Sequence, residues 1–78
     1  MILDKLKEIF AKVMPNADTS SITRESNLVT DLGINSLTMM LLAIMVEDEF
    51  GFHFEGSAKL ETVGDIVDYV AEKTELRV

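Results

Sequence analysis

The first part of the chain places hydrophobic and charged residues at helical spacing. The apolar positions are Ile2, Leu3, Leu6, Ile9, Phe10 and Val13, with lysine and glutamate between them. At this spacing the apolar side chains share one face, so the pattern predicts an amphipathic helix over residues 2–14. Pro15 ends this helix, because the residue before a proline is disfavoured in helical backbone.

A second helix, predicted from Asn35 or Ser36 to about Phe50, is apolar nearly all round. At about 100° per residue, one side carries a core stripe, Met39, Leu42, Ala43, Val46 and Phe50, and the other carries Leu37, Met40, Leu41 and Ile44 and continues into Asp48. A chain of 78 residues is too small to bury both faces of every helix. We therefore expect an exposed apolar stripe that begins at Ser36 and is rimmed by Glu47 and Asp48.

A third helix is predicted after Thr62, which is followed three residues later by Asp65, as in a capping box. Its core stripe is Val63, Ile66, Val67, Val70 and Ala71, and Lys73 and Arg77 near its end suit the helix dipole. Gly51 stops the second helix, and residues 57–60 can form a brief helical turn. The fold class predicted is all-α, with three main helices and one short helix in a single domain, residues 1–78.

Residues 15–35 are rich in Ser, Thr, Asn and Asp and have no sustained period, which indicates a long ordered loop. Ile22, Leu28, Val29, Leu32 and Ile34 are its possible anchors, with one helical turn expected near Ile22. Gly33 is expected to take a left-handed conformation just before the second helix. Loops of this length are uncommon in compact domains unless they serve function.

Charge is distributed unevenly along the chain. The net charge is −7, from 14 acidic and 7 basic residues, but residues 1–24 have a net charge of +1 and residues 25–78 a net charge of −8. This argues against nucleic acid or an anionic membrane as a partner and favours proteins with basic patches. No stretch is suited to spanning a bilayer and the start lacks a signal-peptide layout, so we expect a cytoplasmic protein.

The usual catalytic constellations are absent from the sequence. There is no cysteine, and the lone His53 between two phenylalanines is better explained as a structural or solvated residue than as a base. Glu47, Asp48 and Glu49 are consecutive, and consecutive helical residues do not face each other, so they form a solvated face and no metal site. We predict that the chain is not an enzyme, although an enzyme using His53 is an alternative.

Ser36 has two interpretations from the residues alone. Serine is a favoured N-cap, and capping is the more common role of a serine at this position. Alternatively, an exposed hydroxyl at a helix N-terminus can carry a covalently attached phosphate group, because the backbone N–H groups and the helix dipole favour an anion there.

The run DLGINSL, followed by an acidic helix ending in EDEF, resembles the attachment-site motif of the acyl carrier protein family. The upstream ITRESNL and the downstream TVGDIVDYV also resemble that family at suitable spacing, and the resemblance covers residues 2–73. It implies a small four-helix bundle in which a separate phosphopantetheinyl transferase attaches 4′-phosphopantetheine from coenzyme A to Ser36. The thiol of the arm would carry acyl groups as thioesters for enzymes of fatty-acid, polyketide or related biosynthesis.

Three positions depart from the family pattern. The family commonly has aspartate directly before the serine and acidic residues two and five positions after it, where this chain has Asn35, Thr38 and Leu41. We therefore expect a docking surface more hydrophobic than usual, with its acidic contacts moved to Glu47 and Asp48. Its predicted members are Leu37, Met40, Leu41, Ile44, Glu47 and Asp48. Because rim charges mainly set association rate and partner choice, this favours a specialised carrier.

The resemblance also implies that the acyl chain folds back into the bundle. Burial is worth about 0.8 kcal/mol per methylene. The candidate wall residues are Met40, Ile44, Val46, Phe54, Leu60 and Val63, for each of which plain core packing is the alternative. Two other functions stay open: an aminoacyl or peptidyl carrier, and an unmodified helical module that binds partners through the exposed stripe. The protein is expected to be a monomer.

Overall fold

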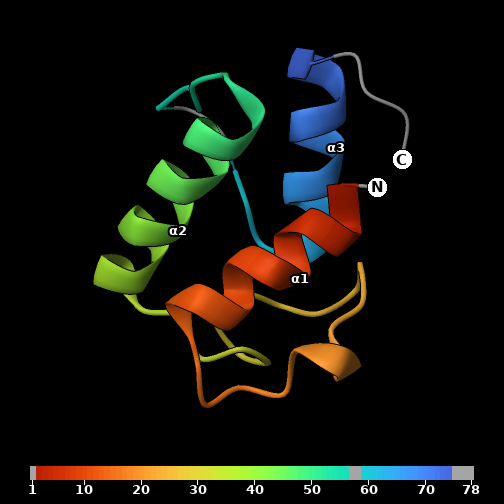
Figure 1. The fold of residues 1–78 in the computed structure, drawn as a ribbon, viewed down its shortest axis with the longest axis vertical. Coiled ribbons are helices and arrows are strands. Elements are labelled where there is room, and N and C mark those ends of the chain that lie inside the picture. Colours follow the sequence, from red (N-terminus) through yellow and green to blue (C-terminus); the bar gives the residue numbers. More distant parts are fainter. Residues whose placement is uncertain (1, 57–58, 75–78) are drawn as a thin grey trace.

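Three α-helices and one turn of 3₁₀-helix form the regular elements of the computed structural model, which describes residues 2–56 and 59–74 (Figure 1). The elements are α1 (Ile2–Val13), η1 (Thr19–Ser21), α2 (Ser36–Phe50) and α3 (Val63–Thr74). They confirm the all-α prediction, and the short helix is the one expected near Ile22. Of the helical turn expected at 57–60, residues 57–58 lie outside the described part, as does Arg77, and residues 59–60 are not helical.

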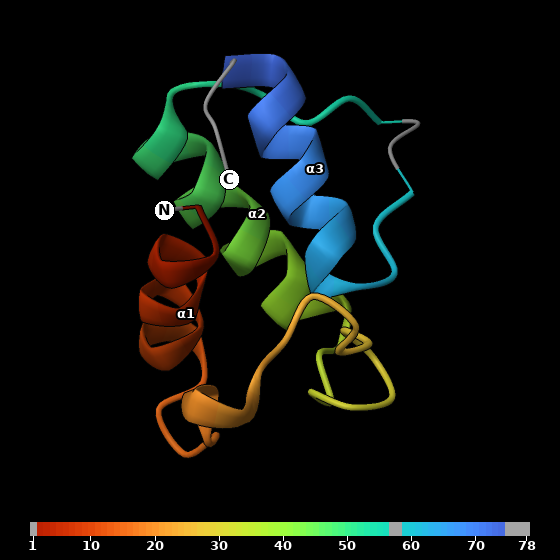
Figure 2. The ribbon, with the colours of Figure 1, turned by 90° about the vertical axis from the view of Figure 1, so that its right-hand side faces the viewer.

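The core lies where the three helices meet, because α1 contacts both α2 and α3. Figure 2 gives the side view of the three helices, with the long loop of residues 15–35 below them. The core side chains, all at most 4% exposed, are Ile2, Leu6, Ile9, Phe10, Ile22, Leu28, Ile34, Leu42, Val46, Val63, Ile66, Val67 and Val70. The long loop thus supplies three of its five expected anchors. Val29 is a correction, because it is 63% exposed.

Backbone hydrogen bonds fasten the long loop to the start of α3. The amide of Leu28 donates to the carbonyl of Glu61 (2.9 Å), and that of Val63 donates to Ser26 (3.0 Å). Between these two bonds lies an isolated antiparallel bridge joining residues 27 and 62. One residue later the amide of Gly64 donates to the carbonyl of Arg24 (2.8 Å). The segment leading to Ser36 is therefore held by a helix far along the chain.

Side chains and one glycine shape the end of this loop. The Asn27 Oδ1 accepts hydrogen bonds from the amides of Val29 and Thr30, both at 2.9 Å, and the Asp31 carboxylate accepts one from the Asn27 amide at 2.7 Å. Gly33 then takes a φ of 68°, which confirms the predicted left-handed turn. Such a φ is strained for residues with a Cβ, so glycine suits the reversal before α2.

The helix ends follow the predicted signals. Asn35 is the N-cap of α2, and Gly51, with φ 71°, ends that helix. The Thr62 hydroxyl accepts a hydrogen bond from the Asp65 amide (3.2 Å), and the Asp65 carboxylate accepts one from the Thr62 amide (3.0 Å), which confirms the capping box. Within residues 2–56 and 59–74, no helix has the length and apolar character needed to cross a membrane.

Candidate functional site

Ser36 is the first residue of α2 and is exposed. The capping hydrogen bond is made by its neighbour: Asn35 Oδ1 accepts from the Thr38 amide at 2.8 Å. The Ser36 hydroxyl makes no hydrogen bond to any residue that the structure describes. Of the two residues expected as possible caps, Asn35 takes the role, and the serine hydroxyl is left available for chemistry.

The surroundings of this helix N-terminus suit a negatively charged group. The first turn of α2 contains no acidic residue. Asp31, five residues earlier, uses its carboxylate to accept the Asn27 amide. The free N–H groups of a first helical turn carry a partial positive charge that favours phosphate. The donors present here therefore fit a phosphate ester on the Ser36 hydroxyl.

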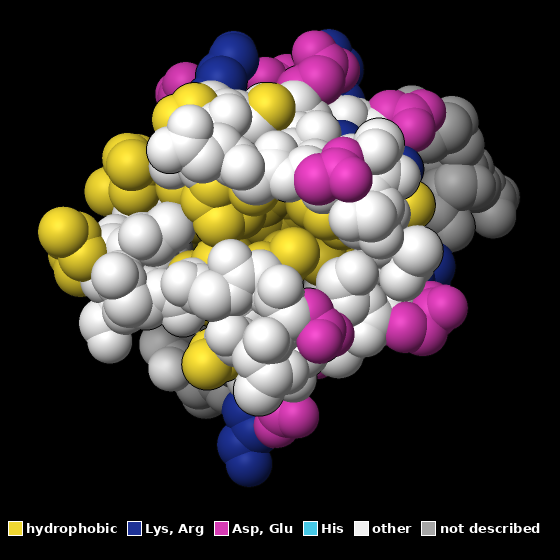
Figure 3. Space-filling view, turned by 90° about the horizontal axis from the view of Figure 1, so that it is seen from below, with side chains coloured by type: hydrophobic (Ala, Val, Ile, Leu, Met, Phe, Trp, Pro, Cys, Tyr) yellow, Lys and Arg dark blue, Asp and Glu magenta, His cyan; other side chains and the backbone are white. Residues whose placement is uncertain are grey.

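An open depression lies beside this hydroxyl. It has a volume of about 520 Å³ and is lined by Val29, Ile34, Asn35, Ser36 and Met39. Ile34 is buried, whereas Val29 is exposed. Figure 3 shows the loop end of the molecule, where the surface is hollowed and hydrophobic side chains form its floor. The serine is therefore next to a partly apolar surface.

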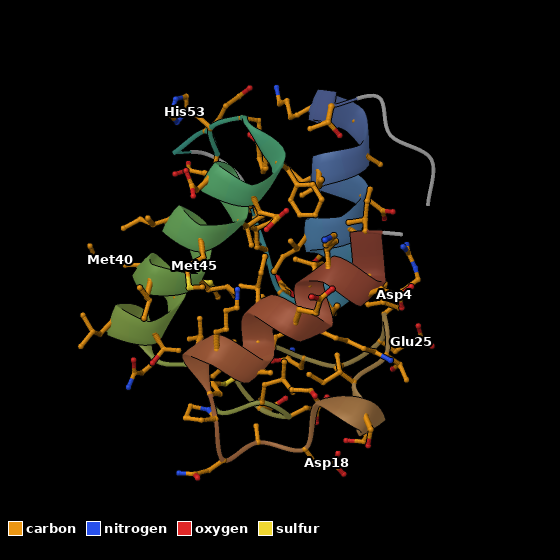
Figure 4. All side chains as sticks on the ribbon, viewed as in Figure 1. Asp4, Asp18, Glu25, Met40, Met45 and His53 are labelled. Carbon is orange, nitrogen blue, oxygen red and sulfur yellow. The ribbon has the colours of Figure 1, made fainter. Side chains whose placement is uncertain are left out.

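The outward face of α2 carries the predicted apolar stripe. Its exposed members are Leu37 (76%), Met40 (62%), Leu41 (48%) and Ile44 (58%). Met40 points away from the rest of the bundle in Figure 4. The predicted exposure is confirmed, and the use of this face for docking stays a prediction.

The acidic end of α2 differs from the prediction of a fully solvated face. Glu47 is only 25% exposed at its side chain, and its Oε2 accepts the Phe54 amide at 2.7 Å. The same oxygen lies 3.9 Å from Nδ1 of His53, whose side chain is 94% exposed and projects outward in Figure 4. Glu47 therefore holds the connection after α2, and Asp48 remains as an exposed carboxylate.

A second open depression, of about 460 Å³, lies at this end. It is lined by Ile44, Glu47, Asp48, Gly51, Phe52 and His53. With two carboxylates among its lining, this surface suits a basic side chain. The two ends of α2 thus present different chemistry.

The six candidate acyl-wall residues separate into two groups. Val46 and Val63 are fully buried, and Phe54 and Leu60 are partly buried against the core. Met40 and Ile44 instead lie on the exposed face, so the structure does not bring them together with the other four. This correction arises because α2 is apolar on both sides, which makes the inner face ambiguous in the sequence.

An aromatic cluster near α3 was missed by the sequence analysis. The rings of Phe52 and Phe54 have centroids 4.8 Å apart, and the Tyr69 ring lies 4.9 Å from that of Phe54. The Tyr69 hydroxyl accepts the Glu55 amide at 2.8 Å. The only signal in the sequence was the spacing of the two phenylalanines around His53, and this spacing did not indicate that Tyr69 of α3 would pack against them.

Comparison with known proteins decides the family. A family model described as a phosphopantetheine attachment site matches residues 4–70. The acyl carrier protein of Clostridium perfringens is 42% identical over 77 residues, covering 95% of this chain and 99% of that protein. The chain belongs to the acyl carrier protein family. The predicted family is confirmed.

Other relatives agree with this acyl carrier protein assignment. The acyl carrier protein of Thermotoga maritima is 38% identical over 74 residues, covering 92% of this chain and 90% of that protein. The solved structure of a candidate acyl carrier protein from Mycobacterium tuberculosis matches with a TM-score of 0.85 and 27% identity, covering 94% of this chain and 99% of that one. The match to this solved structure supports the fold as well as the family.

Membership of the acyl carrier protein family fixes the general chemistry. Proteins of this family are carriers and not enzymes, so an enzyme using His53 is no longer needed to explain the chain. Their prosthetic group is covalently attached 4′-phosphopantetheine, whose thiol forms thioesters with acyl groups. Family partners are a phosphopantetheinyl transferase and acyl-handling enzymes.

Proposed function

We propose that Ser36 is the attachment residue and that this carrier delivers acyl thioesters between enzymes of fatty-acid, polyketide or related biosynthesis. One observation carries the proposal: the Ser36 hydroxyl is exposed and is not used in capping, because Asn35 Oδ1 accepts the Thr38 amide. A transferase can therefore reach the oxygen without opening the helix. The chain has no cysteine, so the thiol comes from the prosthetic group.

The residues around Ser36 have distinct roles in this proposal. The first-turn amides of α2 favour the phosphate of the arm electrostatically. Gly33 and Asn35 direct the chain into the helix so that the serine stays at its exposed start. Asp31 is held by the Asn27 amide, which keeps its negative charge in a structural role within the loop.

The docking surface is proposed to be the exposed stripe of α2 together with its acidic end. Its apolar members Leu37, Met40, Leu41 and Ile44 lie between Ser36 and Asp48. Since Glu47 is engaged with the Phe54 amide, Asp48 is the exposed carboxylate of this surface that remains for a basic partner residue. We expect a partner with an apolar patch and one basic side chain near Asp48, which favours a specialised carrier.

For the cargo, Val46, Phe54, Leu60 and Val63 are the proposed acyl-wall residues, since all four face the core. Each buried methylene would contribute about 0.8 kcal/mol, so separating these side chains to admit a chain can be offset by a medium-length acyl group. An aminoacyl or peptidyl cargo is the alternative. The carrier is proposed to act as a monomer.

The test is intact mass before and after incubation with coenzyme A, magnesium and a promiscuous phosphopantetheinyl transferase. We expect wild type to gain one phosphopantetheinyl group and Ser36→Ala to gain none. Ser21→Ala is the matched control, because Ser21 is also an exposed serine but lies in η1. It should be modified like wild type.

If Ser36→Ala gains the group, Ser36 is not the attachment residue. If neither wild type nor Ser36→Ala gains it with any of several transferases, Ser36 is also rejected. The second result would favour an unmodified module that binds partners through the exposed stripe. Asn35→Asp, which restores the residue common in the family, tests whether a particular transferase needs a carboxylate at this position. Circular dichroism of each variant ensures that loss of modification does not come from loss of fold.

A further inference from the structure

The depression beside Ser36 contains an apolar side chain that is exposed to water, although packing of the fold does not need it there. Val29 forms part of its wall and is 63% exposed, although the isoleucines and leucines of the same loop are all buried or partly buried. Ile34 is 3% exposed, and Met39 packs against the core. An apolar surface that stays open to water is stabilised when an apolar group covers it.

We propose that the pantoyl part of the arm rests in this depression when the carrier holds no acyl group. The inference rests on the proposed attachment at Ser36 and specifies where the arm lies. Ser36 itself lines the depression, so the phosphate end of the arm is tethered at its edge. The next part of the arm bears a geminal dimethyl group, which can cover the side chains of Val29, Ile34 and Met39.

Asn35 adds a polar contact at the same edge. Its Oδ1 accepts the Thr38 amide, and its side-chain N–H₂ makes no hydrogen bond to the residues described. An amide nitrogen has two donors. They can donate hydrogen bonds to the phosphate or to the oxygen of the pantoyl hydroxyl, and an ionised carboxylate at this position has no such donors.

The depression at the other end of α2 is a poorer site for the arm. Its lining begins at Ile44, eight residues beyond Ser36, which is about 12 Å along a helix at 1.5 Å per residue. It also contains Glu47 and Asp48, whose charges would need to be desolvated by an apolar group. The interior is already filled, since Leu42, Val46 and Val63 are at most 1% exposed.

The proposal is tested by NMR on protein labelled with ¹³C in the Val, Ile and Met methyl groups and carrying an unlabelled arm. Isotope-filtered NOE spectra of the holo protein should contain cross-peaks from the pantoyl methyl groups to the Val29 and Met39 methyl groups. In Val29→Ser these cross-peaks to Met39 should be lost or strongly weakened. Thr30→Ser is the matched control, since Thr30 is exposed next to Val29 in the same loop but does not line this depression, and it should keep them.

Intact mass is measured on each sample first, so that the two proposals fail separately. If wild type gains no phosphopantetheinyl group on Ser36, both the proposed function and this inference are overturned. If the group is present but the pantoyl methyl groups have no cross-peaks, or only cross-peaks to other residues, the inference alone is overturned. Cross-peaks that persist unchanged in Val29→Ser would also overturn it.

Discussion

The N-termini of α2 and α3 meet the same requirement with different chemistry. Each helix begins with backbone N–H groups that have no partner inside the helix. At α3 the Asp65 carboxylate accepts the amides of Glu61 (2.9 Å) and Thr62 (3.0 Å), and the loop covers Gly64. At α2 the cap is the neutral Asn35, and no acidic residue lies in the first turn.

The difference shows that one helix start contributes mainly to stability and the other is left open for the prosthetic group. At α3 the Asp65 carboxylate accepts the amides of the two residues before the helix, and loop carbonyls accept the amides of Val63 and Gly64, so this end is a fixed part of the fold. A neutral cap holds α2 in place but leaves its positive end to an added anion. Substitutions at the start of α3 should therefore change mainly stability, and those at the start of α2 should change mainly the response to the prosthetic group.

The largest effect is expected from Gly64→Ala at the start of α3. A Cβ at this position would lie 3.0 Å from the Arg24 carbonyl oxygen and 3.3 Å from the Arg24 Cβ. Relieving this contact must shift the loop or the helix, which should lower the free energy of unfolding by about 1–3 kcal/mol. Urea denaturation of the unmodified protein measures it.

Gly56→Ala is the matched control, because a Cβ there has no atom within 4 Å. It should be neutral or slightly stabilising, since alanine reduces the entropy of the unfolded chain. Equal stability of the two variants would mean that the loop is not tightly fastened to α3, and the contrast between the two helix starts would then lose its basis.

A smaller loss is expected from Asp65→Ala. Hydrogen bonds from the Glu61 amide and then the Thr62 amide hold the pKa of Asp65 below its ordinary value of 3.8. Loss of such a cap should lower the free energy of unfolding by about 1–2 kcal/mol at neutral pH. Because the unfolded state takes up the proton at higher pH, the stabilisation is complete above 3.8 and is lost as pH falls through the lowered pKa.

The measurement is urea denaturation of wild type and Asp65→Ala over a series of decreasing pH values. The two curves should approach each other as pH falls below the ordinary carboxyl pKa. Asp48→Ala removes an exposed carboxylate that caps no helix and is the control at neutral pH. A gap between wild type and Asp65→Ala that stays constant with pH would contradict the capping role of the charged carboxylate.

The smallest effect is expected from Asn35→Asp at the start of α2. In the apo protein a negative charge near the helix N-terminus should raise the free energy of unfolding by about 0.3–1 kcal/mol. In the holo protein the gain should be smaller, because the phosphate on Ser36 would already occupy this region and repel the new charge. Equal gains in the apo and holo forms would show that the two anions do not share the same end of α2.

The hydrophobic periodicity and the local capping and turn residues were sufficient to predict most of the architecture from the sequence. The exposed stripe of α2 followed from its spacing, and the turns at Gly33 and Gly51 followed from the need for a left-handed residue at each place. The capping box of α3 was equally local, since Thr62 and Asp65 are three residues apart. These features depend on neighbours in the sequence, which a pattern can detect.

Features that join distant segments could not be predicted from the sequence in the same way. The bridge between residues 27 and 62 lies between two polar stretches without a period, so nothing indicated the pairing. The Glu47 carboxylate looked solvated in a row of acids, but the backbone of Phe54 returns to it. Met40 and Ile44 were assigned to both faces of α2 because the hydrophobic pattern alone does not say which side another element covers.

The bridge between residues 27 and 62 also sets an order of events during synthesis. Until Thr62 has left the ribosome, Asn27 has no strand-like partner, and Arg24 has no Gly64 against which to pack. Domains fold as units while the chain emerges from its N-terminus. The serine is thus made early, but its setting is completed only when the last helix begins. We expect a transferase that requires the finished loop to modify only chains in which the start of α3 has emerged and paired with the loop.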